Sequence, residues 1–187
     1  MEQNNKEQRR RLRHAYMELG TQMHPNAFVT LTTNDTVKTD PRKSTDQENG
    51  PSKALTWRYQ GEPQISEMSK TLDMTRLIGE YLAMMDRALL GRKWSQALPD
   101  QRTDGIFVIE HTETNIHAHG LLRFPAAKTY DLEVLTLLKW NRLTQSGDTN
   151  FQWIYDGERA AEYCTKELAS PQFNPDQVVL ARQFMAA

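Results

Sequence analysis

The chain has very little of several features that each point to a particular class of protein. It holds a single cysteine, Cys164, so no internal disulfide is possible and nothing indicates an oxidising compartment. No apolar run approaches the roughly 20 residues that cross a bilayer, and the polar, basic N-terminus lacks the apolar core of a signal peptide. The formal net charge of −1 argues against a uniformly basic surface. We therefore expect a cytoplasmic protein without a membrane partner.

The sequence also lacks a glycine-rich loop ending in Gly-Lys-Ser or Gly-Lys-Thr, which excludes the common nucleotide-binding motif of molecular motors. Its 187 residues suit one domain with a sizeable core. We expect a single domain over residues 1–187 with three distinctive parts. These are a basic N-terminal helix at 1–20, a polar surface loop at 34–53 and a C-terminal extension at 170–187.

The spacing of apolar residues predicts alternating helices and strands. Helices are expected at 6–19, 66–90, 130–144 and 158–169, with a short one from about 176. Strands are expected at 27–33, 54–59 and 151–155, and a two-stranded hairpin at 105–124. This order favours an α+β fold in which helices pack on one face of a mostly antiparallel sheet.

The hairpin carries the residues that could bind a metal. His117 and His119 are two apart on a strand, so both imidazoles leave the same face. If the turn lies between His111 and Ile116, antiparallel pairing sets Glu110 across from His117. Two imidazoles and a carboxylate suit Mg²⁺ or Mn²⁺. A one-residue slip would present His111 instead, Glu113 is a weaker candidate in the turn, and the alternative is a strand with two structural histidines.

The predicted helix at 158–169 holds a candidate nucleophile. Tyr163 and Lys166 are three apart, which places them on one helix face. A nearby cation or metal stabilises a phenolate and the charge that builds on an attacked phosphate. Tyrosine, lysine and a metal together indicate phosphodiester transesterification. The alternative is a core aromatic followed by a solvated lysine.

Three short motifs together resemble those of the HUH endonucleases. His117-Ala118-His119 is similar to their paired-histidine motif, and Tyr163-Cys164-Thr165-Lys166 to the tyrosine motif of single-tyrosine Rep proteins, the rolling-circle replication initiators. The segment 28–32, Phe-Val-Thr-Leu-Thr, resembles their early strand motif. The motifs occur in the family's order, from about residue 28 to residue 166.

The resemblance implies a ferredoxin- or RRM-like central antiparallel sheet of about five strands with helices packed on it, and the histidines on a central strand. It implies sequence-specific nicking and rejoining of single-stranded DNA, in which Tyr163 attacks the DNA and forms a covalent 5′-phosphotyrosine and Lys166 positions the phosphate or the tyrosine. It also implies that His117, His119 and Glu110 hold Mg²⁺ or Mn²⁺. The expected partners are single-stranded DNA or a DNA hairpin at the replication origin of a plasmid or phage-like element, with a separate host helicase and polymerase.

Two alternatives remain open. A transposase or relaxase of the same superfamily would use the same chemistry on another genetic element. A non-catalytic RRM-like protein would instead bind nucleic acid on exposed sheet aromatics, for which Phe28 and Phe107 are the candidates.

Overall fold

The computed structural model describes residues 2–34, 67–112, 115–125, 131–144 and 146–185. The predicted edge strand at 54–59 and, after its first residue, the predicted loop at 34–53 lie outside these residues. Within them, every helix is too short or too polar to cross a membrane.

In the described part of the chain, five antiparallel strands form one sheet in the order β4-β1-β3-β2-β5. The strands are β1 (Ala27–Thr32), β2 (Asp104–Glu110), β3 (His117–Arg123), β4 (Asp148–Trp153) and β5 (Val178–Leu180). The helices are α1 (Glu2–Gln22), α2 (Glu67–Leu90), α3 (Leu132–Trp140) and α4 (Gly157–Cys164). Short 3₁₀ segments are η1 (Gly91–Gln96), η2 (Pro99–Gln101), η3 (Lys166–Ala169), η4 (Pro175–Gln177) and η5 (Ala181–Phe184). The predicted α+β class with a five-stranded antiparallel sheet is confirmed.

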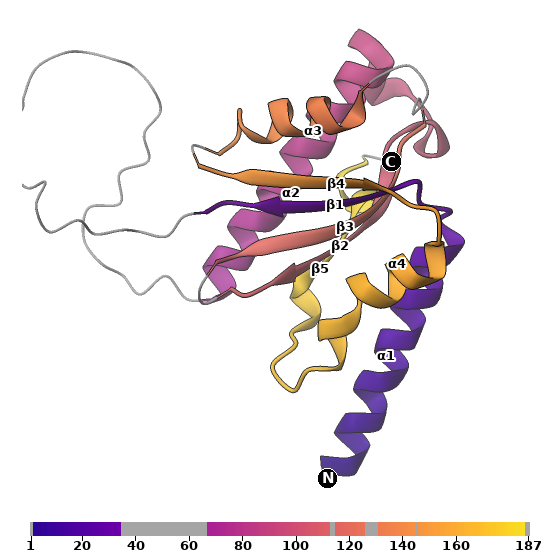
Figure 1. Cartoon of the computed structure of the whole chain (residues 1–187), viewed down its shortest axis with the longest axis vertical. Helices are drawn as coiled ribbons and strands as arrows, with labels where there is room; N and C mark the ends of the chain where they lie inside the picture. Colours follow the sequence, from indigo (N-terminus) through magenta and orange to yellow (C-terminus); the bar gives the residue numbers. More distant parts are fainter. Residues whose placement is uncertain (1, 35–66, 113–114, 126–130, 145, 186–187) are drawn as a thin grey trace, which may run out of the picture.

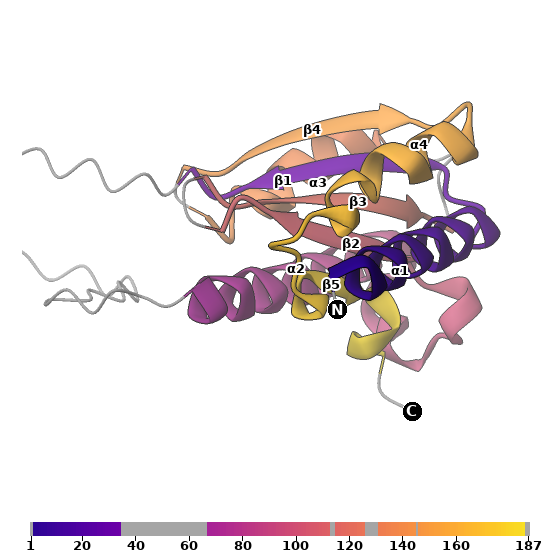
Figure 2. The same ribbon diagram turned by 90° about the horizontal axis from the view of Figure 1, so that it is seen from below.

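Helices cover both faces of the sheet, so the expectation of one covered face is wrong (Figures 1 and 2). One core lies between the sheet and the α2–α3 pair, and the other lies between the sheet and the α1–α4 pair. The physical reason is visible in β2, where Ile106, Phe107, Val108 and Ile109 are all buried. Consecutive apolar residues in a strand point to opposite faces, and both faces then need cover.

The C-terminal segment departs from its prediction. In place of a helix from about 176, Val178–Leu180 forms the edge strand β5, which pairs with β2 through Phe107 and Val179. Two adjacent valines favour extended backbone, and a short apolar run does not distinguish a strand from a helix by its periodicity. The extension therefore completes the sheet.

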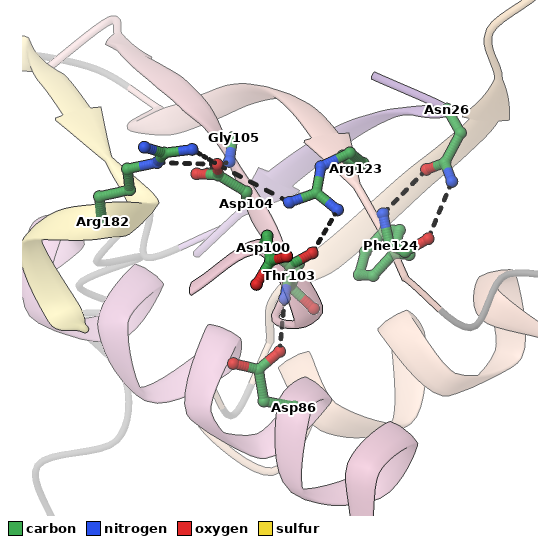
Figure 3. Close-up of polar contacts among 9 residues, drawn as sticks. All are labelled: Asn26, Asp86, Asp100, Thr103, Asp104, Gly105, Arg123, Phe124 and Arg182. Carbon is green, nitrogen blue, oxygen red and sulfur yellow. Dashed lines mark hydrogen bonds and ion pairs between the residues drawn. The ribbon is translucent and has the colours of Figure 1, made fainter. Parts of the chain in front are cut away.

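Buried charges tie the end of the sheet together (Figure 3). The Asp104 carboxylate, at the start of β2, accepts hydrogen bonds from the Gly105 amide at 2.9 Å and from Arg182 Nε at 2.9 Å. Arg123 of β3 approaches the same carboxylate at 3.9 Å and donates to the Asp100 carbonyl at 2.9 Å. Asp104 thus links β2 to β3 and to η5.

A second buried carboxylate, Asp86 of α2, fixes the segment that immediately precedes β2. It accepts hydrogen bonds from Arg102 Nε and from the Thr103 amide, both at 2.8 Å. Replacing Asp86 by alanine should lower the free energy of unfolding by roughly 3–5 kcal/mol, because it leaves the buried guanidinium of Arg102 without its partner. Urea denaturation followed by circular dichroism measures this loss.

The matched control is Glu80→Gln, which breaks an exposed ion pair with Arg76 on the same helix. That variant should lose less than about 1 kcal/mol. Equal losses in the two variants would show that the buried pair does not anchor α2.

Candidate metal centre

The pairing of β2 with β3 sets the ligand face. Glu110 is directly opposite His117, and Val108 is opposite His119. The predicted register is therefore confirmed, and the one-residue slip that would present His111 is excluded. His111 follows β2 with a left-handed backbone (φ 54°), and its ring stacks on His117 with 5.1 Å between centroids. Glu113 lies outside the described residues.

Glu110, His117 and His119 form a compact cluster of potential metal ligands. Glu110 Oε2 lies 3.6 Å from His117 Nε2 and 3.6 Å from His119 Nε2. One ligand atom from each of the three residues lies within 4.8 Å of the others. These separations make the three residues candidates to hold one divalent cation.

The carboxylate of Glu110 has an unusual environment for a charged group. Its side chain is 1% exposed, and neither oxygen accepts a hydrogen bond within the described part of the chain. Buried carboxylates need hydrogen bonds, ion pairs or a metal. Burial raises the pKa of Glu110, but His117, His119 and Lys166 outweigh this effect and hold its pKa below the usual value. The carboxylate is therefore charged at neutral pH, and its oxygens suit a cation.

Hydrogen bonds at the far side of each imidazole orient the two histidines. His117 Nδ1 donates to the Asn115 carbonyl at 3.0 Å, which leaves the Nε2 lone pair of the neutral ring directed at Glu110. His119 Nδ1 lies 2.9 Å from Thr30 Oγ1. Partners of this kind orient metal-binding imidazoles in proteins. Sequence reasoning assigned no role to Thr30, although its register opposite His119 places it on the same face.

The two histidines differ in protonation. Burial lowers the pKa of His119 to about 4, so this ring is neutral at pH 7 and its lone pair is available. The neighbouring Glu110 raises the pKa of His117 above its ordinary value. Imidazoles bind metals in the neutral form, so His117 would have to be deprotonated to hold a cation together with His119.

Helix α4 brings a tyrosine to this cluster. The side chain of Asp156 accepts a hydrogen bond from the Arg159 amide and caps the helix N-terminus. Ala161 and Cys164 are fully buried against the sheet. The Cys164 thiol, whose pKa burial raises, donates to the His119 carbonyl at 3.4 Å. Cys164 thereby docks α4 on β3 at His119, and Tyr163 is its immediate neighbour.

The ring of Tyr163 packs beside the candidate ligands. Its centroid lies 5.5 Å from that of His119 and 5.6 Å from that of Phe28, and both contacts are edge-to-face. The residue is nevertheless 52% exposed. A tyrosine whose ring is packed on its neighbours but which is open to solvent is accessible to a large substrate. A fully buried core aromatic is not accessible in this way.

Lys166 connects the tyrosine to the carboxylate. Its Nζ lies 3.5 Å from Glu110 Oε2 and 4.3 Å from the centre of the Tyr163 ring. The predicted helix to residue 169 is wrong in detail, because α4 ends at Cys164 and Lys166 begins η3 after a break at Thr165. Partial burial lowers the pKa of Lys166, but Glu110 and Tyr163 outweigh it and raise the pKa above its usual value. The structure thus brings all five predicted site residues together.

The two aromatic residues considered for base stacking are not exposed together on the sheet. Phe107 is fully buried in the core under α2 and α3, whereas Phe28 points to the opposite face. Phe28 itself is only 9% exposed and packs on His119 at 5.4 Å. The alternative of a stacking surface made by both rings is not supported. Phe28 is in register with Leu121, which is in register with Ile106, so Phe107 lies one strand position further on and faces the other core.

Comparison with known proteins gives no relative: no family model, no curated protein and no solved structure matches the chain.

Proposed function

We propose that this protein is a metal-dependent endonuclease that nicks and rejoins single-stranded DNA through a covalent 5′-phosphotyrosine. The observation that carries the proposal is the convergence of three groups: a half-exposed tyrosine, a lysine ammonium, and a cluster of one carboxylate and two imidazoles. Tyrosine transesterification of a phosphodiester needs a nucleophile, a positive charge near the phosphate and a metal site.

Glu110, His117 and His119 are the residues that would hold the cation. Their fit is supported by the buried carboxylate oxygens of Glu110, which accept no hydrogen bond from the described residues. A donor set of one carboxylate and two imidazoles suits Mn²⁺ better than Mg²⁺, because Mg²⁺ prefers oxygen ligands. When bound, the cation supplies Lewis acidity that polarises a phosphate oxygen.

Tyr163 is the proposed nucleophile. Its hydroxyl oxygen forms a bond to phosphorus while the bond from phosphorus to the 3′ oxygen breaks. The phenol proton passes to solvent, to which this half-exposed side chain is open, and the departing 3′ oxygen takes up a proton. No oxidation or reduction occurs, and attack by the 3′ hydroxyl on the phosphotyrosine reverses the step and rejoins the strand.

Lys166 is the proposed charge-stabilising residue. Its raised pKa keeps the side chain an ammonium at neutral pH. Because its Nζ lies against the Tyr163 ring, its charge favours the phenolate that develops during attack and attracts the phosphate. The ion pair with Glu110 holds it in this place.

The biological role that we propose is initiation of rolling-circle replication on a plasmid or phage-like element. It is supported by the order of the three motifs, by the single tyrosine in the late motif and by the lysine three residues after it. The free 3′ hydroxyl would prime synthesis by a host polymerase, and a separate helicase would unwind an origin presented as single strand or hairpin.

Covalent capture of DNA tests the proposal. A random-sequence single-stranded DNA labelled at its 3′ end is incubated with the protein and Mn²⁺, then separated under denaturing conditions. We expect a labelled protein band that protease digestion removes and that a chelator prevents from forming. DNA labelled at its 5′ end should give only shorter free fragments and no labelled protein band, because the protein becomes linked to the 5′ phosphate of the other fragment.

The outcome separates the proposal from a non-catalytic binding protein. Such a protein would retard DNA in a native gel with or without chelator and would yield no band that survives denaturation. That result would overturn the proposal.

A further inference from the structure

A groove of about 610 Å³ opens beside Tyr163, a volume within the range of ligand sites. One wall is strand β4 with Asn150 and Gln152, and the other is helix α4 with Arg159 and Tyr163. Phe28 and Thr30 of β1 lie between the two walls, and Tyr155 lies on the connection from β4 to α4. The groove is therefore lined by the proposed nucleophile and by two residues that contact the candidate ligand His119, namely Phe28 and Thr30.

The polar groups of the groove are available to a ligand. Arg159 lies one helical turn before Tyr163, so the two share a face of α4. It is exposed and makes no ion pair with any described residue. The nearby Asp156 uses a carboxylate oxygen to cap α4. A guanidinium without an ion pair beside a nucleophile for phosphate chemistry suits a phosphate or a base edge.

Strand β4 adds two amides on the side of the sheet that carries the site. Asn150 is in register with Thr30, and Gln152 is in register with Phe28. Gln152 Nε2 donates to Asn150 Oδ1 at 3.0 Å, which leaves the Gln152 carbonyl oxygen as an acceptor and the Asn150 NH₂ group as a donor. A donor and an acceptor side by side match the edge of a nucleobase.

The aromatic at the mouth of the groove has no packing role. Tyr155 is 95% exposed, which is unusual for a large aromatic because most bury part of the ring. Single-stranded nucleic acids bind by stacking their bases on such rings and by placing their phosphates near arginine. The combination of Tyr155, Arg159 and the two amides has this chemistry.

We propose that this groove binds a base of the single-stranded DNA next to the phosphate that Tyr163 attacks. The base stacks on Tyr155, Asn150 and Gln152 contact its edge, and Arg159 binds the adjoining phosphate. The inference rests on the proposed function for the identity of the ligand, and it adds a set of contacts that would select the cleavage sequence.

Binding without cleavage tests the groove. In a Tyr163→Phe background with chelator present, fluorescence anisotropy measures the affinity for a short fluorescein-labelled single-stranded DNA. Tyr155→Ala and Arg159→Ala should each weaken binding by about tenfold. Tyr155→Phe, which keeps the ring, should bind clearly more tightly than Tyr155→Ala. The matched control is Arg92→Ala, an exposed cation on η1 outside the groove, which should change the affinity by less than about twofold.

The result does not depend on the nicking assay. Three results would overturn the assignment of the groove as a DNA-binding site, even if the wild-type protein forms the covalent adduct. These are unchanged affinity in both groove variants, an equal loss of affinity in Arg92→Ala, and no measurable binding by the parent protein. Weakened binding in the groove variants without any adduct from the wild-type protein would instead overturn the proposed reaction and leave the groove as a nucleic-acid site.

Discussion

Replacing Tyr163 by phenylalanine should reduce the covalent protein–DNA adduct by roughly 10³-fold or more. The substitution removes only the attacking oxygen. The contacts of the Tyr163 ring with His119, Phe28 and Lys166 should remain, because phenylalanine has the same ring. The melting temperature and the affinity for Mn²⁺ should therefore stay close to those of the wild-type protein. Adduct formation is measured in a single turnover with 3′-labelled DNA, and Mn²⁺ binding by titration calorimetry.

The control is Tyr16→Phe, which removes the same hydroxyl from a half-buried tyrosine on α1. It should form the adduct at the wild-type rate. An adduct formed at the wild-type rate by Tyr163→Phe would show that another group attacks the phosphate. A loss in both variants would point to damage of the α1–α4 layer in place of a lost nucleophile.

The parts of the site that could be predicted from the sequence are those set by local geometry. The positions of His117 and His119 on one face follow from the period of a strand. The residue opposite His117 in the hairpin follows from the length of the turn between β2 and β3. The structure pairs His117 with Glu110, as this turn predicts. Both relations involve residues close together in the chain, where few backbone solutions exist.

The contacts that join α4 to this hairpin could not be derived in the same way. The Cys164 thiol meets the His119 carbonyl across 45 residues of chain, and nothing in the local spacing specifies that pair. Only the order of motifs suggested that Tyr163 and the histidines belong together. The role of Thr30 was missed for a similar reason, because its contact with His119 depends on the pairing of β1 with β3.

The prediction that helices cover only one face of the sheet is wrong, although the apolar pattern of β2 indicates otherwise. The apolar run at 106–109 reads as a buried strand, and its consecutive apolar residues already imply cover on both sides. The second layer is supplied by α1 and α4, and α1 has many charged residues. Gly20 of α1 lies so near the sheet that a Cβ would approach Leu121 Cδ1 to 2.9 Å. Because Gly20 has no side chain, α1 can lie close enough to cover an apolar face of the sheet despite its many charged residues.

Replacing Glu110 by glutamine should weaken Mn²⁺ binding by more than about 100-fold, because loss of a direct ligand exceeds the effect of an outer hydrogen-bond partner. The substitution keeps the volume of a fully buried side chain and removes the negative charge that three cationic or potentially cationic groups face. In the wild-type protein, Mn²⁺ at 100 times its dissociation constant should stabilise the fold by about 2.7 kcal/mol. In Glu110→Gln, the stabilisation at the same Mn²⁺ concentration, followed as the rise in melting temperature, should fall to about 0.4 kcal/mol or less. The DNA adduct should disappear.

Two further variants make the result specific to this carboxylate. Glu80→Gln applies the same chemical change to an exposed glutamate on α2 and should keep both the Mn²⁺-induced stabilisation and the adduct. His111→Ala removes the ligand that a shifted register would have used, and it should change Mn²⁺ affinity far less than Glu110→Gln does, because His111 stacks on His117 outside the ligand cluster. Wild-type Mn²⁺ affinity in Glu110→Gln would place the ion elsewhere, and the proximity of Tyr163 to this cluster would then have no catalytic meaning.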